Sequence, residues 1–357
     1  MPFQTARIID ANLNRAAEGL RVLEDLARFI VSDAAISGEL KLMRHELAES
    51  AGPLAVSLLS GRDAEHDVGA APRGPGWQSY PGLLSLATAN AARVEQSLRV
   101  IAELSRCRDS GVSLDPTKFE QTRFRLYSIQ KKLVSRLMRR DKAARVKGVY
   151  AVLDSAALGG RSELEAARQV IRGGARVVQL RDKPRSQGAL VAIAERLSRL
   201  CREAGVLFLV NDYPDVALAS DADGVHLGQD DLPVEVARRV LPVDRLVGCS
   251  VSTFEEAVRA EKQGADYLAV GALYATPTKP EASVAGLETL RQVKARVSVP
   301  VVGIGGVNED NVAQVVASGA DAAAVISGIF GQKDVEVATR RLAEAFMRGE
   351  NCQRVRT

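Results

Sequence analysis

The 357-residue sequence has few of the residues that metal centres, disulfides and nucleic-acid-binding surfaces require. Three histidines and four scattered cysteines argue against a multi-histidine zinc or iron centre and against a disulfide framework. Aromatic residues make up only 4% and the net charge is only +4, so we expect no nucleic-acid partner. Any bound metal must then be held by carboxylates, which favours Mg²⁺ as the cofactor.

Long apolar runs are also missing. No window approaches about 18 uninterrupted apolar residues, so we expect no transmembrane helix and no membrane partner. The N-terminus lacks a basic head followed by an apolar run, so it does not read as a secretory signal and we expect a cytoplasmic protein. The composition, 46% apolar and 26% charged, is typical of a globular protein, and the length predicts two domains.

The first part of the chain, residues 1–143, carries apolar residues at helical spacing and is predicted to be a helical domain. A glycine- and proline-rich segment, Gly61–Gly82, separates two predicted helical pairs. The predicted helices are Thr5–Val31, Leu40–Leu59, Leu83–Cys107 and Thr117–Arg140.

An internal repeat with an offset of 78 residues relates the first predicted helix to the third. This predicts two duplicated helical hairpins, packed as a four-helix bundle, although the second helices of the two pairs match poorly. The role of this domain stays open. The matching positions include Asn12 with Asn90, Arg15 with Arg93, and Leu20–Val22 with Leu98–Val100.

The second part, residues 144–357, alternates short β-branched runs with amphipathic helices. Continuous apolar runs are typical of parallel strands that are buried on both faces. Eight such units in about 200 residues predict a TIM (β/α)8 barrel, with a doubly wound open sheet as the alternative. The runs are Val149–Leu153, Val177–Leu180, Phe208–Val210, Gly224–Leu227, Leu246–Cys249, Tyr267–Val270, Val299–Gly303 and Ala322–Ile326.

Polar residues and glycines follow seven of these runs, at the strand ends where barrels carry their active sites. Asp212 and Asp231 follow neighbouring strands, and one or two carboxylates plus substrate phosphates commonly hold Mg²⁺. Arg181, Lys183 and Lys279 lie on the same predicted rim. Basic side chains alone would repel a metal ion, so a site with both indicates a polyanion that binds them together. A diphosphate substrate is therefore predicted.

A second anion site is predicted after strands seven and eight, at Gly303–Gly306 and Ser327-Gly328. Barrels commonly bind a phosphate there through backbone N–H groups. Two phosphorylated substrates, one of them a diphosphate, indicate a transferase that expels pyrophosphate. Ionisation of a diphosphate ester depends on charge neutralisation, so no histidine base is required.

The motifs QLRDK, VNDYPDVALASDADGVHLGQDDL, GCS, TPTKPE, VVGIGGV and VIS, in this order, resemble thiamine-phosphate synthase over residues 148–330. The resemblance implies condensation of 4-amino-2-methyl-5-(diphosphooxymethyl)pyrimidine with a thiazole ethyl phosphate, giving thiamine phosphate and pyrophosphate. It implies a dissociative mechanism, and loss of carbon dioxide where the thiazole carries a carboxylate. Which thiazole form is preferred stays open. Ser252 and Glu281 replace a histidine and an aspartate that are common in the family.

The resemblance also implies roles for individual residues. Asp212 and Asp231 correspond to the family's Mg²⁺ ligands, and the role of His226, within GVHLGQ, stays open. The implied catalytic residues are Arg181, Lys183, Ser250 and Lys279. The implied pyrimidine diphosphate site is Gln179, Leu180, Arg181, Asp182, Lys183, Asn211, Ser250 and Lys279. The implied thiazole phosphate site is Thr276, Pro277, Thr278, Gly306, Ile326 and Ser327.

Two other functions remain as alternatives at this point. One is a thiazole tautomerase on a similar barrel, and the other is a thiamine-precursor binding protein. The helical half resembles the N-terminal extension of some bacterial thiamine-phosphate synthases, which has been proposed to act on a thiamine precursor as a pyrimidine phosphate kinase. The sequence carries no P-loop there. We expect the small phosphorylated substrates as partners. Whether the protein forms a homo-oligomer stays open.

Overall fold

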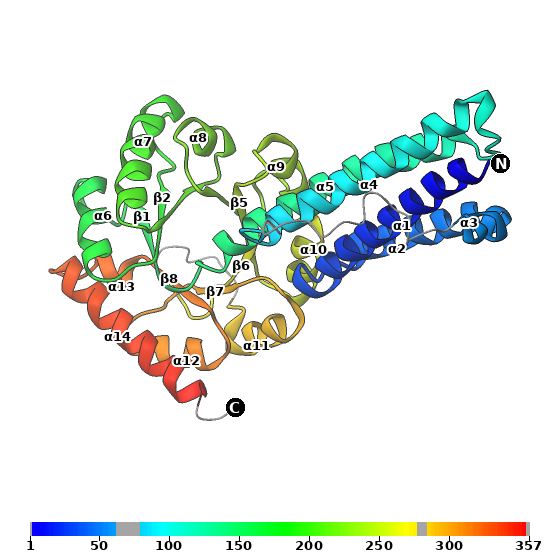
Figure 1. Cartoon of the computed structure of the whole chain (residues 1–357). Helices are drawn as coiled ribbons and strands as arrows, with labels where there is room; N and C mark the ends of the chain where they lie inside the picture. Colours follow the sequence, from blue (N-terminus) through cyan, green and yellow to red (C-terminus); the bar gives the residue numbers. More distant parts are fainter. Residues whose placement is uncertain (1, 62–78, 277–283, 355–357) are drawn as a thin grey trace. The chain divides into compact units, whose positions relative to one another are not determined.

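The computed structural model describes residues 2–61, 79–276 and 284–354, and it divides into two compact units, Met1–Met138 and Arg139–Thr357 (Figure 1). This division falls inside helix α5 (Pro116–Ala143). The domain boundary expected between residues 143 and 144 stays a prediction. None of the helices in the described ranges is both long and apolar enough to span a membrane.

The helical unit is built from long helices whose apolar stripes face a common core. Two expectations need correction. The predicted helix Leu40–Leu59 is interrupted at Gly52–Leu54, where Pro53 cannot donate a backbone hydrogen bond, and the first helix ends in a π-helical turn, Leu26–Ile30. The α-helices are α1 (Phe3–Asp25), α2 (Ala34–Ala51), α3 (Ala55–Ser60), α4 (Leu83–Arg106) and α5.

The two repeated asparagines have the same local environment in α1 and α4. Asn12 and Asn90 are both buried, and each donates from Nδ2 to the carbonyl four residues earlier, at 2.8 and 2.9 Å. The two helices pack closely at Gly19, where a Cβ atom would lie 2.6 Å from the Val94 side chain. The two matched asparagines therefore each satisfy a backbone carbonyl of their own helix.

The second unit is a closed barrel of eight parallel strands in chain order, with β1 paired to β8. The prediction of a TIM barrel is confirmed, and the open-sheet alternative is wrong. The strands are β1 (Gly148–Asp154), β2 (Val177–Arg181), β3 (Leu207–Asn211), β4 (Gly224–Leu227), β5 (Leu246–Val251), β6 (Tyr267–Val270), β7 (Val301–Ile304) and β8 (Ala322–Val325).

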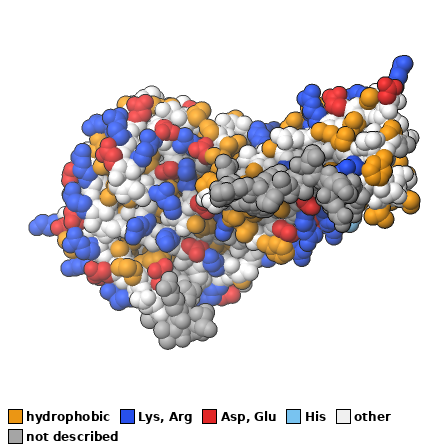
Figure 2. Space-filling view, viewed as in Figure 1, with side chains coloured by type: hydrophobic (Ala, Val, Ile, Leu, Met, Phe, Trp, Pro, Cys, Tyr) orange, Lys and Arg blue, Asp and Glu red, His pale blue; other side chains and the backbone are white. Residues whose placement is uncertain are grey.

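Helices surround the strands (Figure 1), and one apolar core lies between the two layers while a smaller one fills the barrel interior. Figure 2 shows basic and acidic side chains interspersed on the visible face of this unit, as expected for a solvated outer ring. The helices are α6 (Glu163–Arg172), α7 (Gln187–Glu203), α8 (Pro214–Ala219), α9 (Val234–Val240), α10 (Phe254–Gln263), α11 (Gly286–Arg296), α12 (Val312–Ala317), α13 (Ser327–Phe330) and α14 (Val335–Arg354).

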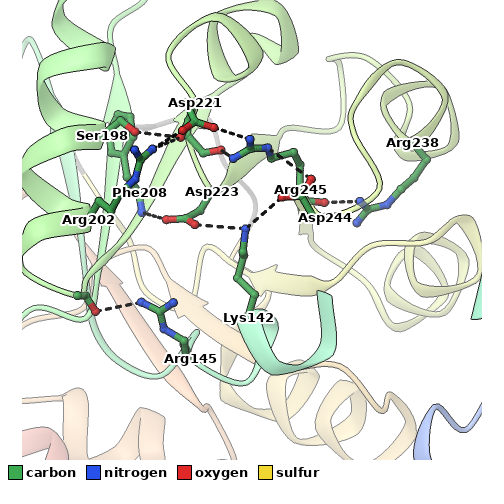
Figure 3. Close-up of polar contacts among 12 residues, drawn as sticks. Lys142, Arg145, Ser198, Arg202, Phe208, Asp221, Asp223, Arg238, Asp244 and Arg245 are labelled. Atoms are coloured by element: carbon green, nitrogen blue, oxygen red, sulfur yellow. Dashed lines mark hydrogen bonds and ion pairs between the residues drawn. The ribbon is translucent and has the colours of Figure 1, made fainter. Parts of the chain in front are cut away.

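The end of α5 is tied to the N-terminal ends of the barrel strands by ion pairs and hydrogen bonds. Lys142 lies 3.4 Å from Asp223, just before β4, and Arg145 donates to the carbonyl of Gly205, just before β3 (Figure 3). Arg139 donates from Nε to Asp266 at 2.9 Å, and both side chains are about nine-tenths buried. This end of a TIM barrel serves stability.

These contacts predict that residues 139–143 stabilise the barrel. A fragment of residues 139–357 should be more stable than one of residues 144–357 by about 2 kcal/mol, since the shorter one loses a buried charged hydrogen bond. Urea denaturation of both fragments measures the difference. The variant Arg139→Gln in the longer fragment serves as the control that removes only the guanidinium. Equal stability of the two fragments would contradict the prediction.

Candidate active site

A cavity of about 540 Å³ opens at the C-terminal ends of the barrel strands. Its volume is within the range of small-molecule sites. It brings together predicted site residues from six strand ends and from the segment after β6. These residues are Gln179, Arg181, Lys183, Asn211, Asp212, Asp231, Ser250, Thr276, Gly306, Ile326 and Ser327.

Two basic side chains line one side of the cavity. Arg181, at the end of β2, forms an ion pair with Asp154, at the end of β1. The Asp154 side chain is only 5% exposed and also accepts from the backbone N–H of Ala156, so it fixes the guanidinium in place. The Lys183 side chain is 61% exposed, and its Nζ lies 3.7 Å from Asp212. The pair presents positive charge to an anionic ligand.

Two carboxylates meet next to these cations. Burial and the neighbouring Asp231 raise the pKa of Asp212 to about 7, while Lys183 and Arg181 act in the opposite direction. Asp212 has a positive φ of 65°, and its N–H donates to the carbonyl of His226 at 2.8 Å. Oδ2 of Asp231 accepts from the backbone N–H of Gly228 at 2.6 Å. Two carboxylates held this close are stabilised by a cation.

The segments after β7 and β8 line the cavity across the barrel from β3 and β4. Gly305 and Gly306 both have positive φ angles, 94° and 68°, which favour glycine. Asn311 donates from Nδ2 to the carbonyl of Gly306 at 2.9 Å and fixes this turn. Ser327 is the first residue of α13. Small residues and backbone N–H groups suit a phosphate.

The floor of the cavity contains a buried imidazole. His226 Nε2 lies 2.9 Å from Ser250 Oγ, and Nδ1 lies 2.9 Å from the Tyr267 hydroxyl. Burial lowers the pKa of His226 to about 4, so the ring is neutral near pH 7. His226 therefore has the character of a hydrogen-bonding group rather than of a general base.

Some predicted site residues do not line the cavity. Leu180 is part of the core between strands and helices. Asp182 is buried and pairs with Arg185 at 3.0 Å. Pro277, Thr278 and Lys279, together with Glu281, lie outside the described residues. Cys249 is buried, which raises the pKa of its thiol to about 11 and leaves it a poor nucleophile.

Residues that hold the cavity-lining side chains in position were not identified from the sequence. Asp154 ends β1 in the same way as the predicted polar residues end the other strands, so its position was a usable signal. Tyr150 and Tyr267 lie within apolar strands, and their hydroxyls are 3.0 Å apart inside the barrel. No local pattern distinguishes them from core residues, because only barrel closure brings them together.

Comparisons with known families agree with this geometry. The family described as "Thiamine monophosphate synthase" matches residues 149–329, which is the barrel. The family described as "ThiD2 family" matches residues 7–132, which lie in the helical unit.

Full-length relatives carry both regions. The chain is similar to "Thiamine-phosphate synthase" of Thermosynechococcus vestitus, with 38% identity over 96% of this chain and 95% of the relative. It is similar to the protein of the same description from Synechocystis sp., with 37% identity over 97% and 98% of the two chains.

Other relatives correspond to the barrel alone. "Thiamine-phosphate synthase" of Moorella thermoacetica is 47% identical over 56% of this chain and 96% of its own length. The solved structure "Thiamine phosphate pyrophosphorylase" from Pyrococcus furiosus is 41% identical, with a TM-score of 0.54 over 58% of this chain and 98% of that one. The fold, the cavity and these matches agree, so the chain belongs to the thiamine-phosphate synthase family and is a transferase of thiamine biosynthesis.

Proposed function

We propose that the barrel joins 4-amino-2-methyl-5-(diphosphooxymethyl)pyrimidine to a thiazole ethyl phosphate, with or without a thiazole carboxylate, and releases pyrophosphate. The observation that carries this proposal is one cavity with a charged side, made by Arg181, Lys183, Asp212 and Asp231, and a glycine-rich side around Gly306. The first suits a diphosphate and the second a single phosphate. Thr276, Ile326 and Ser327 line the second side.

The two carboxylates fit Mg²⁺. Within the described part of the chain, no cluster of three or more acidic, histidine or cysteine ligands is present. Mg²⁺ is commonly held by one or two carboxylates together with substrate phosphates, and Asp212 and Asp231 supply that number. We assign them as the ligands. A bound Mg²⁺ would neutralise negative charge on the diphosphate.

The chain's own residues would assist departure of the diphosphate. Arg181, fixed by Asp154, and Lys183 would bind its oxygens as negative charge develops there. Asn211, Gln179 and Ser250 would orient the pyrimidine. The reaction we propose is dissociative: the C–O bond to diphosphate breaks, the aminopyrimidine stabilises the carbocation, and the thiazole nitrogen attacks it.

This chemistry also requires that water is kept from the carbocation and that no competing base is present. Apolar side chains of Val152, Ala269, Ala324 and Ile304 line the cavity and limit the access of water to the carbocation. His226 is neutral and internally hydrogen-bonded, consistent with a reaction that needs no histidine base. We further propose a cytoplasmic location, where the free thiols of Cys107, Cys201 and Cys249 stay reduced.

The direct test is pyrophosphate release by the full chain, supplied with both substrates and Mg²⁺. We expect release to require all three components and to occur with formation of thiamine phosphate. Omission of the thiazole phosphate is the control for simple hydrolysis of the diphosphate. Absence of release under saturating substrates would contradict the proposed function. Running the assay with each thiazole form in turn would also identify the preferred acceptor.

A further inference from the structure

A continuous chain of hydrogen bonds crosses the interior of the barrel beneath the cavity. Nε2 of Gln179 donates to the Tyr150 hydroxyl at 2.6 Å, and this hydroxyl lies 3.0 Å from that of Tyr267. The Tyr267 hydroxyl lies 2.9 Å from Nδ1 of His226, whose Nε2 lies 2.9 Å from Ser250 Oγ. Gln179 and Ser250, the two ends of this chain, both line the cavity.

The three residues in the middle of this hydrogen-bond chain are buried. The exposed fractions of Tyr150, Tyr267 and His226 are 1%, 0% and 6%. An imidazole buried between two hydroxyl groups is neutral and carries a single N–H. Each hydroxyl also carries a single proton. A buried polar group without a partner is unfavourable, so the protons must be arranged to satisfy every link at once.

Only two proton arrangements satisfy every link and also leave neither tyrosine proton without an acceptor. In the first, the Gln179 amide donates to Tyr150, Tyr150 to Tyr267, and Tyr267 to Nδ1 of His226. The His226 Nε2–H then donates to Ser250 Oγ, so the Ser250 proton is directed to another acceptor. In the second arrangement every bond is reversed: the amide oxygen of Gln179 accepts from Tyr150, and Ser250 donates to Nε2.

The orientation of the Gln179 amide selects the first arrangement, since its Nε2 faces the Tyr150 hydroxyl. The amide oxygen of Gln179 is then available to accept from a ligand N–H, and the Ser250 hydroxyl is available to donate to a ligand nitrogen. A 4-aminopyrimidine offers the complementary pair, an amino donor and a ring-nitrogen acceptor. A 4-oxopyrimidine reverses the pair, because it offers a carbonyl acceptor and a ring N–H donor.

We propose that Tyr150, Tyr267 and His226 are positioning residues that couple the Gln179 amide to the Ser250 hydroxyl and thereby make the cavity select a 4-aminopyrimidine over a 4-oxopyrimidine. This inference rests on the proposed function, because it takes the pyrimidine diphosphate as the ligand of Gln179 and Ser250. It extends that function by assigning substrate selection to the hydrogen bonds that join Gln179 to Ser250 through the barrel interior.

The first test reads the proton arrangement without any substrate. The sequence has only three histidines, so the full chain labelled with ¹⁵N-histidine gives few signals in a long-range ¹H–¹⁵N spectrum, and His226→Gln identifies the relevant one. We expect the Nε2–H tautomer at His226. The Nδ1–H tautomer would mean that the hydrogen bonds are donated in the opposite direction, from Ser250 towards Gln179, and would overturn the proposal.

Two variants then remove different hydrogen bonds from this hydrogen-bond chain. Tyr267→Phe removes the donor to Nδ1, so the His226 signal should shift away from the pure Nε2–H tautomer. Tyr150→Phe should keep that tautomer, since Tyr267 can still donate, but it releases the Gln179 amide. Phenylalanine retains the ring packing, and circular dichroism verifies folding. Tyr127→Phe in α5, where the tyrosine is 41% exposed, is the control. An unchanged His226 signal in Tyr267→Phe would contradict the coupling.

The second readout is selectivity in binding. Dissociation constants are measured by calorimetry for the 4-amino diphosphate and its 4-oxo analogue, with Mg²⁺ and without the thiazole phosphate. We expect each chain variant to lower the ratio of the two affinities by about tenfold, the effect of misdirecting one hydrogen bond, and the control to leave it unchanged. An unaltered ratio in both variants would overturn the proposal, whereas a wild-type chain that releases no pyrophosphate would contradict the proposed function instead.

Discussion

Replacing Asp212 by asparagine is expected to lower turnover by on the order of 100-fold and to shift the Mg²⁺ titration to higher concentration. The substitution removes one of two carboxylates assigned to the cation, at the position where the leaving group gains charge. Asparagine suits the positive φ of 65° at this residue, so the backbone should remain in place. Steady-state rates at a series of Mg²⁺ concentrations measure both effects.

Asp212→Asn should lower turnover without lowering the free energy of unfolding, so a stability measurement separates loss of function from loss of fold. Burial and Asp231 raise the pKa of Asp212 from 3.8 to about 7 in the folded chain. A carboxyl whose folded-state pKa is raised destabilises the fold increasingly as the pH rises from about 4 to about 7, and the penalty is fully present above about pH 7. Without Mg²⁺ at pH 8, Asp212→Asn should therefore be at least as stable as the wild type.

A neighbouring carboxylate gives the matched control. Asp215 lies three residues later, in the first turn of α8, and is exposed. Asp215→Asn makes the same chemical change on the outside of the barrel, so its turnover and Mg²⁺ titration should match the wild type. An unchanged Mg²⁺ titration in Asp212→Asn would show that this carboxylate does not bind the cation.

Much of the barrel could be predicted because its strands are short apolar runs at regular intervals. The predicted runs Gly224–Leu227 and Tyr267–Val270 coincide with β4 and β6. The expected run Val299–Gly303 was wrong at its start, since β7 begins at Val301, after Pro300, which has no N–H for the ladder. In the helical unit, the break at Gly52–Leu54 was likewise signalled by Pro53.

The site could be predicted only where polar functional residues directly follow an apolar strand. Arg181, Asp212 and Asp231 follow apolar strands, and polar residues there have no packing role, so they were recognisable. Tyr150 and Tyr267 were not. They are 117 residues apart in sequence and are joined only by closure of the barrel, and a tyrosine in an apolar strand is normally a core residue. Long-range polar contacts of this kind require the three-dimensional structure.

The second large effect is expected at Gly306, which lines the cavity after β7. A Cβ atom at Gly306 would lie 2.7 Å from Cβ of Tyr274 and 2.9 Å from the carbonyl oxygen of Ala275. The segment that leads to Thr276 would have to move, and Thr276 lines the cavity. Gly306→Ala should therefore lower kcat/KM for the thiazole phosphate by about 100-fold, the typical result of displacing a binding group by about 1 Å.

This effect can be separated from backbone strain. Gly159 also has a positive φ, 58°, but a Cβ atom there would meet no atom within 4 Å. Gly159→Ala thus introduces a similar conformational cost without occupying the site, and it should leave both Michaelis constants within about twofold of the wild type. Steady-state kinetics, with each substrate varied in turn, should show that Gly306→Ala impairs use of the thiazole phosphate much more than use of the pyrimidine diphosphate. Equal impairment of both substrates would contradict the assignment of two separate anion sites, because a substitution at one of them would then be felt alike at the other.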